Sequence, residues 1–350
     1  MASRIEDYGI VANGRTVALI SKQGSVDWMC MPNFDSDSCF SSLLGYDEHG
    51  RWVIRPTVEI NSVRQEYEPN SMILFTEFTT DGGKARIVDF MPMTEERSDL
   101  VRIIEGIEGD VPMEVLLTPR FHYGADKPRI LMEGGAVLMT AGPDSMILRG
   151  GKFERTPQGL SCGVTVRAGE SVKFELAWYE SHKKAPPPLD INGERDTASK
   201  YWVEWAKRFP YQGKYREAVL RSLMTLKALT YAPTGAIVAA PTAALPEELG
   251  GVRNWDYRFC WVRDASLTLH ALMFGGYVDE AAAFGAWINR AVAGDPAEVQ
   301  IMYDVHGGRR LTEFELKYLP GYEGSKPVHI GNAAFDQLQL DIYGEALSAL

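Results

Sequence analysis

The pattern of hydrophobic and polar positions changes from strand-like to helical partway along the chain. Up to about residue 185, short apolar runs are broken by Gly, Pro, Asn and Asp, and many such runs predict a β-sandwich. Runs at 72–78 and 84–90 flank Asp81-Gly82, a step that predicts a tight hairpin with positive φ angles. Near the end of this region polar or small residues alternate with apolar ones, which predicts a strand with one buried and one wet face: Val172, Phe174, Leu176 and Trp178.

After Pro186-Pro187-Pro188, which continues neither a strand nor a helix, the apolar spacing becomes helical. We therefore predict three parts: a β-sandwich domain at 1–185, a linker with a helix at 186–212, and an all-α domain at 213–350. The segment 214–231 is apolar over most of its circumference, so we expect it to be surrounded by other elements. The helices are expected at 196–209, 214–231, 265–274, 278–293 and 333–350, with long loops at 232–262 and 294–330.

Length and composition fit this two-domain interpretation. The chain has 350 residues, more than the roughly 250 that one hydrophobic core usually holds. Its 47 acidic and 36 basic side chains give a formal net charge of -11, which would repel a polyphosphate backbone, so we expect no nucleic acid partner. The aromatic content of 11% suits ligands with apolar ring faces, such as sugars.

Cysteine usage and the N-terminus indicate a reducing compartment. Four scattered cysteines lack metal-ligand spacing, so we expect reduced, buried thiols and no metal or other cofactor. The first ten residues carry Arg4, Glu6 and Asp7 and no apolar signal-peptide core. No stretch approaches the ~20 apolar residues of a membrane span, so we expect a cytoplasmic protein without a membrane partner. The sequence carries no signal for the oligomeric state.

The densest segment for chemistry runs from residue 253 to 264. If it is extended, one face carries aromatic side chains and ends in an arginine, and the other carries polar side chains and Cys260. Sugar recognition needs such a combination, because ring C–H faces stack on aromatics while hydroxyls need fixed donors and acceptors. Arg263 would donate and Asp264 would accept, although Asp264 also stands where a helix N-cap is expected. The aromatic face comprises Trp255, Tyr257, Phe259 and Trp261.

The run Asp256-Tyr257-x-Phe259-x-Trp261-x-Arg263-Asp264 resembles the Asp-Tyr-x-Tyr-x-Trp-x-Arg-Asp stretch of glycoside hydrolase family 15, the glucoamylase and bacterial trehalase group. The opening residues 5–9, 24–28 and 33–36 are similar to the N-terminal β-domain of its bacterial members. The resemblance implies an (α/α)6 barrel after the sandwich. It also implies that Arg263 and Asp264 bind the terminal glucose, that Tyr257 faces the glycosidic carbon, and that Trp261 forms part of the pocket wall. We count Trp255, on the same aromatic face, as a further substrate-binding residue.

The resemblance extends to a second loop, residues 319–332, which implies that this loop borders the glucose pocket. Within it we count Lys326 as a further substrate-binding residue. The family pattern has arginine where this chain has His329. From the residues alone, His329 and His306 are expected to be histidines on the loop surface.

Inverting glycoside hydrolysis needs a carboxylic acid and a carboxylate base about 6.5–9.5 Å apart. In the family these are glutamates, the acid in a Trp-Glu motif, and neither pattern occurs in the sequence. We therefore expect both to lie beyond Leu350, and the barrel of twelve helices to be incomplete. Glu247, Glu248 and Glu345 are expected to be surface charges.

The sequence thus predicts an inverting, exo-acting α-glucosidase of glucoamylase or trehalase type, whose partner is an α-glucoside or α-glucan. Two alternatives stay open at this point. One is a non-catalytic carbohydrate-binding or regulatory remnant of such an enzyme. The other is a disaccharide phosphorylase built on a similar plan.

Overall fold

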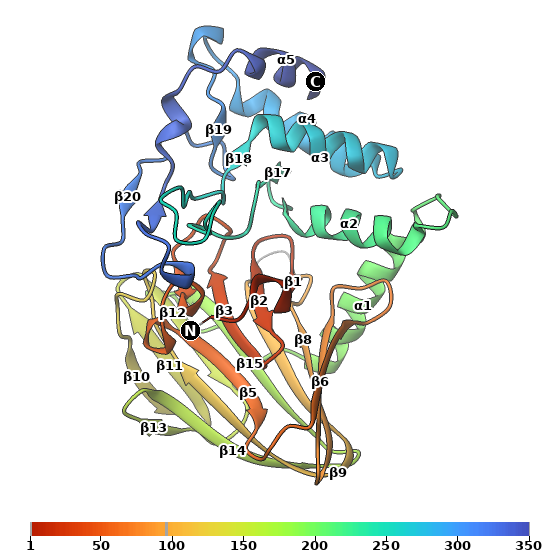
Figure 1. Cartoon of the computed structure of the whole chain (residues 1–350), viewed down its shortest axis with the longest axis vertical. Coiled ribbons are helices and arrows are strands. Elements are labelled where there is room, and N and C mark those ends of the chain that lie inside the picture. The colour runs from red at the N-terminus through yellow and green to blue at the C-terminus, as the bar shows by residue number, and fades with distance from the viewer. Residues whose placement is uncertain (1, 95–96, 350) are drawn as a thin grey trace. The chain divides into compact units, whose positions relative to one another are not determined.

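A computed structural model describes residues 2–94 and 97–349, and the chain forms two compact units (Figure 1). The strand unit contains residues 1–13, 18–32 and 36–203. The helical unit contains residues 204–350 together with two short N-terminal segments, 14–17 and 33–35. The division along the chain falls inside helix α1 (Ile191–Lys207).

The strand unit is a sheet organised around one long strand, β9 (Asp99–Thr118). Its first half pairs with β8 and β15, and its second half pairs with β5 and β14. The remaining strands pair outward from these four. The bounds of the strands besides β9 are β1 (Tyr8–Ala12), β2 (Val17–Ser21), β3 (Ser25–Cys30), β4 (Ser38–Phe40), β5 (Arg51–Pro56), β6 (Ser62–Tyr67), β7 (Leu74–Thr80), β8 (Gly83–Phe90), β10 (Arg129–Glu133), β11 (Ala136–Ala141), β12 (Asp144–Arg149), β13 (Glu154–Thr156), β14 (Gly159–Arg167) and β15 (Ser171–Glu180).

One large core joins both groups of strands. Trp52 and Ile54 of β5 pack in the same cluster as Phe174 and Leu176 of β15, and all four are fully buried. A smaller cluster on β8 and β9 includes Ala198 of α1. The four cysteines are free and buried, as predicted.

The predicted hairpin is present, but its backbone differs from the expectation. β7 and β8 pair up to Thr80 opposite Gly83, which leaves a two-residue turn at Asp81 and Gly82. Neither turn residue has a positive φ; Gly83 has one instead, at 146°. A Cβ at Gly83 would lie 1.9 Å from the Glu108 carbonyl oxygen on the neighbouring strand. The glycine is therefore needed where the strand begins rather than at the turn.

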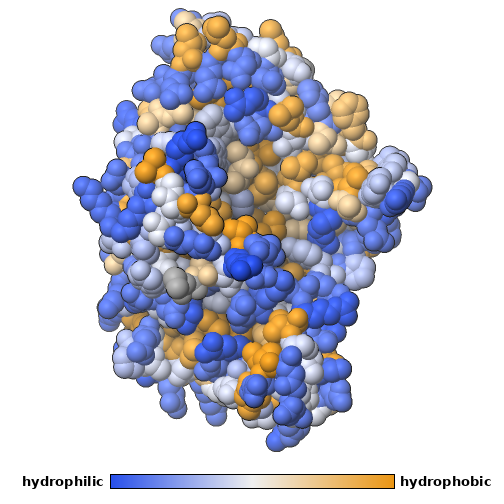
Figure 2. All heavy atoms as spheres, in the orientation of Figure 1, coloured by the Kyte–Doolittle hydropathy of each residue, from blue (hydrophilic) through white to orange (hydrophobic). Residues whose placement is uncertain are grey.

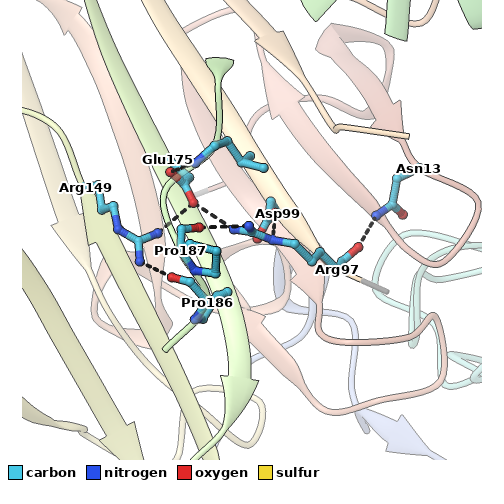
Figure 3. Close-up of polar contacts among 8 residues, drawn as sticks. Asn13, Arg97, Asp99, Arg149, Glu175, Pro186 and Pro187 are labelled. Atoms are coloured by element: carbon cyan, nitrogen blue, oxygen red, sulfur yellow. Dashed lines mark hydrogen bonds and ion pairs between the residues drawn. The ribbon is translucent and has the colours of Figure 1, made fainter. Parts of the chain in front are cut away.

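The polar face of β15 is covered rather than wet at Glu175 and Ala177, while Ser171 at the start of the strand is exposed. Glu175 is 2% exposed and accepts from Arg97 (2.9 Å) and Arg149 (2.7 Å), as Figure 3 shows. Arg97 also pairs with Asp99 at 2.7 Å, and burial raises the pKa of Asp99 to about 6 against the opposing charge of Arg97. Arg149 donates to the carbonyl of Pro186. The proline-rich segment therefore closes over this face, and the prediction of a solvated face was wrong here.

The helical unit contains α2 (Arg216–Ala228), α3 (Val262–Phe274), α4 (Val278–Ala291) and α5 (Asp341–Ala349). α3 packs against α2, α4 and α5. Three two-stranded ladders and three short 3₁₀ turns lie in the long loops: β16 (Thr230–Tyr231) with β17 (Ala236–Ile237), β18 (Cys260–Trp261) with β19 (Met302–Tyr303), β20 (Phe314–Glu315) with β21 (His329–Ile330), and turns at Pro296–Glu298, Tyr322–Gly324 and Ala333–Asp336.

Two helix predictions need correction. The segment 333–350 is interrupted, since a 3₁₀ turn at Ala333–Asp336 is followed by irregular chain before α5 begins at Asp341. α2 buries one face only: Leu220, Leu223 and Met224 are buried, while Val219 is 39% exposed. The apolar residues around most of the circumference of α2 therefore did not predict on how many sides other described residues cover it.

The two N-terminal segments of the helical unit are anchored by hydrogen bonds within that unit. Ala232 donates its backbone N–H to the Gly14 carbonyl at 2.7 Å. Tyr231 donates its hydroxyl to Asn33 at 2.9 Å, and Val305 donates its N–H to Asp35 at 3.2 Å. Residues far apart in sequence thus belong to one packed body. None of the described helices is both long and apolar enough to cross a membrane.

Candidate functional site

The alternation over residues 254–261 assumes an extended segment. In the structure Asp256 forms an isolated β-bridge with Ala243, and Cys260–Trp261 is strand β18. The carbonyls of Trp255, Tyr257 and Phe259 each accept a backbone N–H from residues 239–244, at 2.9–3.0 Å. β18 then pairs with β19, opposing Cys260 to Tyr303. Helix α3 begins directly afterwards at Val262, so the segment passes from an anchored strand into a rigid helix.

One face of this segment lines a cavity of about 340 Å³ within the helical unit. The rings of Tyr257 and Trp261 lie 6.0 Å apart between centroids, and Trp255 stacks on His329 at 5.0 Å. Phe259, predicted on the same face, is buried and does not line the cavity. The lining residues are Trp255, Tyr257 and Trp261 with Glu313, Asn332, Ala333, Ala334 and Gln337.

The opposite face holds a buried ion pair. Arg258 donates to both carboxylate oxygens of Asp256, at 2.9 and 2.7 Å, and both side chains are at most 1% exposed. Asp256 also accepts the Gly331 N–H at 3.1 Å, and Asn332 donates its side-chain amide to the Asp256 carbonyl at 3.1 Å. A buried ion pair is stable only when its remaining hydrogen-bonding groups are also satisfied. The bonds from Gly331 and Asn332 meet this need, and they also fix the segment to the loop that forms the other wall of the cavity.

Arg263 and Asp264 lie in the first turn of α3, beside the cavity but not in its lining. The Arg263 guanidinium is 5.8 Å from the Trp261 ring centroid, 3.2 Å from Asp341 and 3.5 Å from Asp264. Asp264 is not the N-cap, which is Trp261. Its Oδ2 atom and the Trp261 Nε1 atom are buried and find no hydrogen-bond partner within residues 2–94 and 97–349.

The structure leaves Lys326 outside the cavity, as an exposed side chain on the loop before β21. The role predicted for it therefore gains no support from the geometry. Glu247 and Glu248 are exposed, and Glu345 is half-buried on α5; none of the three lines the cavity, in keeping with surface charges.

One cavity residue was missed in the sequence, and one residue that stacks on the cavity wall was misjudged. Glu313 lines the cavity and accepts the Ala333 N–H at 3.1 Å. His329 is 8% exposed, not on the surface, and its Nδ1 atom lies 3.2 Å from the Asn254 carbonyl oxygen. Its Nε2 atom lies 4.0 Å from Glu313. Only the pairing of β20 with β21 brings these residues together, and no local pattern signals that pairing.

The phenol of Tyr257 gives the cavity surface a polar group without a charge. Burial, and then the nearby charges of Glu247 and Asp264, raise the pKa of Tyr257 above its usual value near 10. The phenol therefore stays a neutral donor and acceptor. Flat aromatic faces, a neutral phenol and a carboxylate together suit a neutral ligand with ring C–H faces and hydroxyls.

A strand unit followed by a helical unit with this aromatic cavity is the plan of a class of carbohydrate-active enzymes. Residues 213–350 match the family described as "Glycosyl hydrolases family 15", and residues 1–202 match "Trehalase-like, N-terminal". The chain belongs to glycosyl hydrolase family 15 and has a trehalase-like N-terminal region.

Relatives with the name trehalase match nearly the whole chain. The trehalase of Thermoplasma volcanium is 34% identical over 366 residues, covering 99% of this chain and 56% of that protein. The trehalase of Mycolicibacterium smegmatis is 33% identical over 387 residues, again covering 99% of this chain and 56% of its own length. The chain thus spans little more than half of the relatives it matches.

Among solved structures, a bacterial glucoamylase in complex with acarbose has the same fold over 88% of this chain and 53% of its own. The TM-score is 0.64 and the sequence identity is 12%. This likeness bears out the predicted order of a mostly β region followed by a helical region.

Proposed function

We propose that this chain carries the glucose-binding part of an inverting, exo-acting α-glucosidase that releases glucose from an α-glucoside of trehalose or maltose type. The observation that carries the proposal is the cavity wall of Trp255, Tyr257 and Trp261. Beside this wall two buried polar atoms, Trp261 Nε1 and Asp264 Oδ2, have no hydrogen-bond partner in the described part of the chain, although Asp264 Oδ2 lies 3.5 Å from Arg263 Nη2. Buried polar atoms are usually hydrogen-bonded, so these two are available to a sugar's hydroxyls or to further protein.

Arg263 and Asp264 would grip neighbouring hydroxyls of the terminal glucose, because the first turn of α3 holds both at the edge of the wall. Tyr257 would face the glycosidic carbon. Trp255 and Trp261 would carry the ring face. Lys326 keeps only the role implied by the family resemblance.

For the architecture, we propose a β-sandwich at 1–185, a linker at 186–212, and a partial (α/α)6 barrel at 213–350. Large apolar side chains on the exposed surface of the helical unit support the proposal that its barrel is partial (Figure 2). Single exposed leucines are common, but several large apolar side chains on one surface mark a place where further protein binds. The side chains that support the proposal are Leu267, Met273 and Phe274 on α3, Val278 on α4, Leu338 and Leu340 just before α5, and Leu347 near the end of α5, each at least 49% exposed.

We propose that the general acid and base come from residues other than those described. Glu313 is the carboxylate that lines the cavity, and one of its oxygens already accepts the Ala333 N–H. Inversion needs two carboxyl groups on opposite sides of the scissile bond. The described cavity lining supplies one carboxylate, so a second must be added before this chemistry is complete.

The test is glucose release from trehalose, maltose and maltotetraose by the natural full-length protein and by the 350-residue chain. From the full-length protein only, we expect NMR to show β-glucose released from the non-reducing end of maltose and maltotetraose, and equal amounts of α- and β-glucose from trehalose. Hydrolysis by the 350-residue chain would show that its own carboxylates are catalytic. Release of glucose 1-phosphate, dependent on phosphate, would identify a phosphorylase, and sugar binding without turnover in either form would identify a binding protein.

A further inference from the structure

The strand unit contains a second cavity, with a volume of about 420 Å³. It lies between the loop before β5, the end of β9 and the turn before β14. Leu117 and Leu160 contribute apolar surface, and Arg51, Arg120 and Lys127 contribute positive charge. A smaller cavity of about 190 Å³ shares Arg120 and Lys127 and adds a further arginine, Arg155.

Arg120 is the unusual member of this group. It is 8% exposed, and its one hydrogen bond to another described residue runs from Nη1 to the Pro119 carbonyl at 2.7 Å. No carboxylate of the described chain lies within the 4.0 Å of an ion pair. A guanidinium carries five N–H donors, so most of its donors are left for a cavity ligand. Burial lowers the pKa of Arg120, opposed by the negative charge of Glu48.

The charges around Arg120 leave the cavity positive. Arg51 is balanced by Asp47, whose carboxylate is 2.6 Å away. Arg120 and the exposed Lys127 then face a single further acid in the lining, the exposed Glu48. A net positive cavity is notable in a chain whose formal charge is -11. Since a buried cation is costly unless it is paired, this arrangement favours an anion.

The shape of the donors narrows the class of anion. A guanidinium fork matches the paired oxygens of a phosphate or carboxylate, and a nearby ammonium adds a point charge. The lining also contains the Thr156 hydroxyl and the Gln158 amide, which are neutral donors for further oxygens. Three kinds of donor around one space suit a tetrahedral oxyanion with several oxygens.

We infer that this cavity is a binding site for a phosphate group, either as inorganic phosphate or carried on a sugar phosphate, with Arg120 as its central donor. The site lies in the strand unit and does not depend on the proposed glucosidase function.

The natural full-length protein is titrated with sodium phosphate and, separately, with glucose 6-phosphate by isothermal titration calorimetry, at constant ionic strength set with sodium chloride. We expect saturable binding of at least one of them to a single site. Tighter binding of glucose 6-phosphate would identify a sugar phosphate as the ligand; equal or weaker binding would identify free phosphate.

Arg120→Gln should weaken the affinity roughly tenfold or more, because it removes a charge-assisted donor. Arg167→Gln is the matched control: Arg167 is an exposed arginine of the same unit, lines neither cavity, and its loss should leave the affinity unchanged. Should Arg120→Gln fail to fold, Lys127→Gln at the exposed rim replaces it and should weaken binding several-fold. Binding no stronger than that of chloride would overturn the proposal. Affinities unaffected by both substitutions would do so as well.

Discussion

The two faces of the segment from Asn254 to Trp261 have opposite characters. One face holds Asp256 and Arg258, fully buried and mutually satisfied. The other carries Trp255, Tyr257 and Trp261 along a cavity, next to two buried polar atoms, Trp261 Nε1 and Asp264 Oδ2, that have no hydrogen-bond partner among the described residues. The difference shows that the two faces have separate roles. The ion pair on one face fixes the backbone, so the aromatic side chains on the other face can keep their positions although no described side chain fills the cavity beside them.

The largest expected effect comes from breaking the paired face. Asp256→Ala leaves Arg258 as an uncompensated buried charge and frees the Gly331 N–H, which should cost about 3–5 kcal/mol of unfolding free energy. Urea denaturation followed by circular dichroism measures this loss. Asp279→Ala is the control, since Asp279 is 79% exposed and its pair with Arg208 should contribute less than about 1 kcal/mol. A loss below about 1 kcal/mol for Asp256→Ala would refute a structural role for this face.

The second largest effect should come from Arg263→Ala beside the aromatic face, and here we expect activity to be lost while stability is kept. Arg263→Ala removes a side chain that is 45% exposed, so the unfolding free energy should change by less than about 1 kcal/mol. If Arg263 grips the terminal glucose, kcat/KM for the full-length protein should fall roughly 100-fold or more. Arg290→Ala, on the exposed face of α4, should leave kcat/KM unchanged. Equal rates for both variants would remove Arg263 from the site.

A smaller effect should follow from loosening the support of the aromatic wall. His329→Leu loses the stacking on Trp255 and the contact with the Asn254 carbonyl, which together should raise KM by roughly tenfold or less. Because His329 supports the wall rather than the reacting bond, kcat should change little. His306→Leu, an exposed histidine against Tyr231, is the control. A fall in kcat with unchanged KM would contradict this positioning role.

The smallest expected effect concerns pH. The raised pKa of Tyr257 keeps its phenol protonated to above pH 10, so KM should show no ionisation of this residue from pH 7 to 10. Its folded pKa lies above the unfolded value, so its contribution to stability is complete below pH 10 and is lost as pH rises through the folded pKa. Tyr257→Phe should therefore leave the shape of the KM profile unchanged; an inflection below pH 10 in the wild-type protein that Tyr257→Phe abolishes would contradict this.

The sequence predicted what depends on local pattern. The shared face of Trp255, Tyr257 and Trp261 and the hairpin around Asp81 follow from neighbouring residues, as does the presence of a helix after Trp261. That helix begins at Val262, three residues before the predicted start at Ala265. Glu313 at the cavity and His329 stacked on its wall could not be placed, because the pairing of two strands more than a dozen residues apart brings them there. Long-range pairing carries no periodic signal in one sequence.

Burial of charge was the second limit. Glu175 occupies a polar position of an alternating strand, yet Arg97 and Arg149 bury it. The unit to which a segment belongs was equally hard to predict. The N-terminal segments 14–17 and 33–35 belong to the helical unit, although the sequence pattern around them is that of strands. Pattern predicts which residues lie on one face; it does not predict what covers that face.

The most direct test of the central claim is a crystal structure of the natural full-length protein with bound glucose. The account predicts a glucose ring against Trp255, Tyr257 and Trp261, with hydrogen bonds to Arg263 and Asp264 and with Asp256 and Arg258 still paired behind the wall. Glucose bound elsewhere, with this cavity filled by protein side chains, would contradict it.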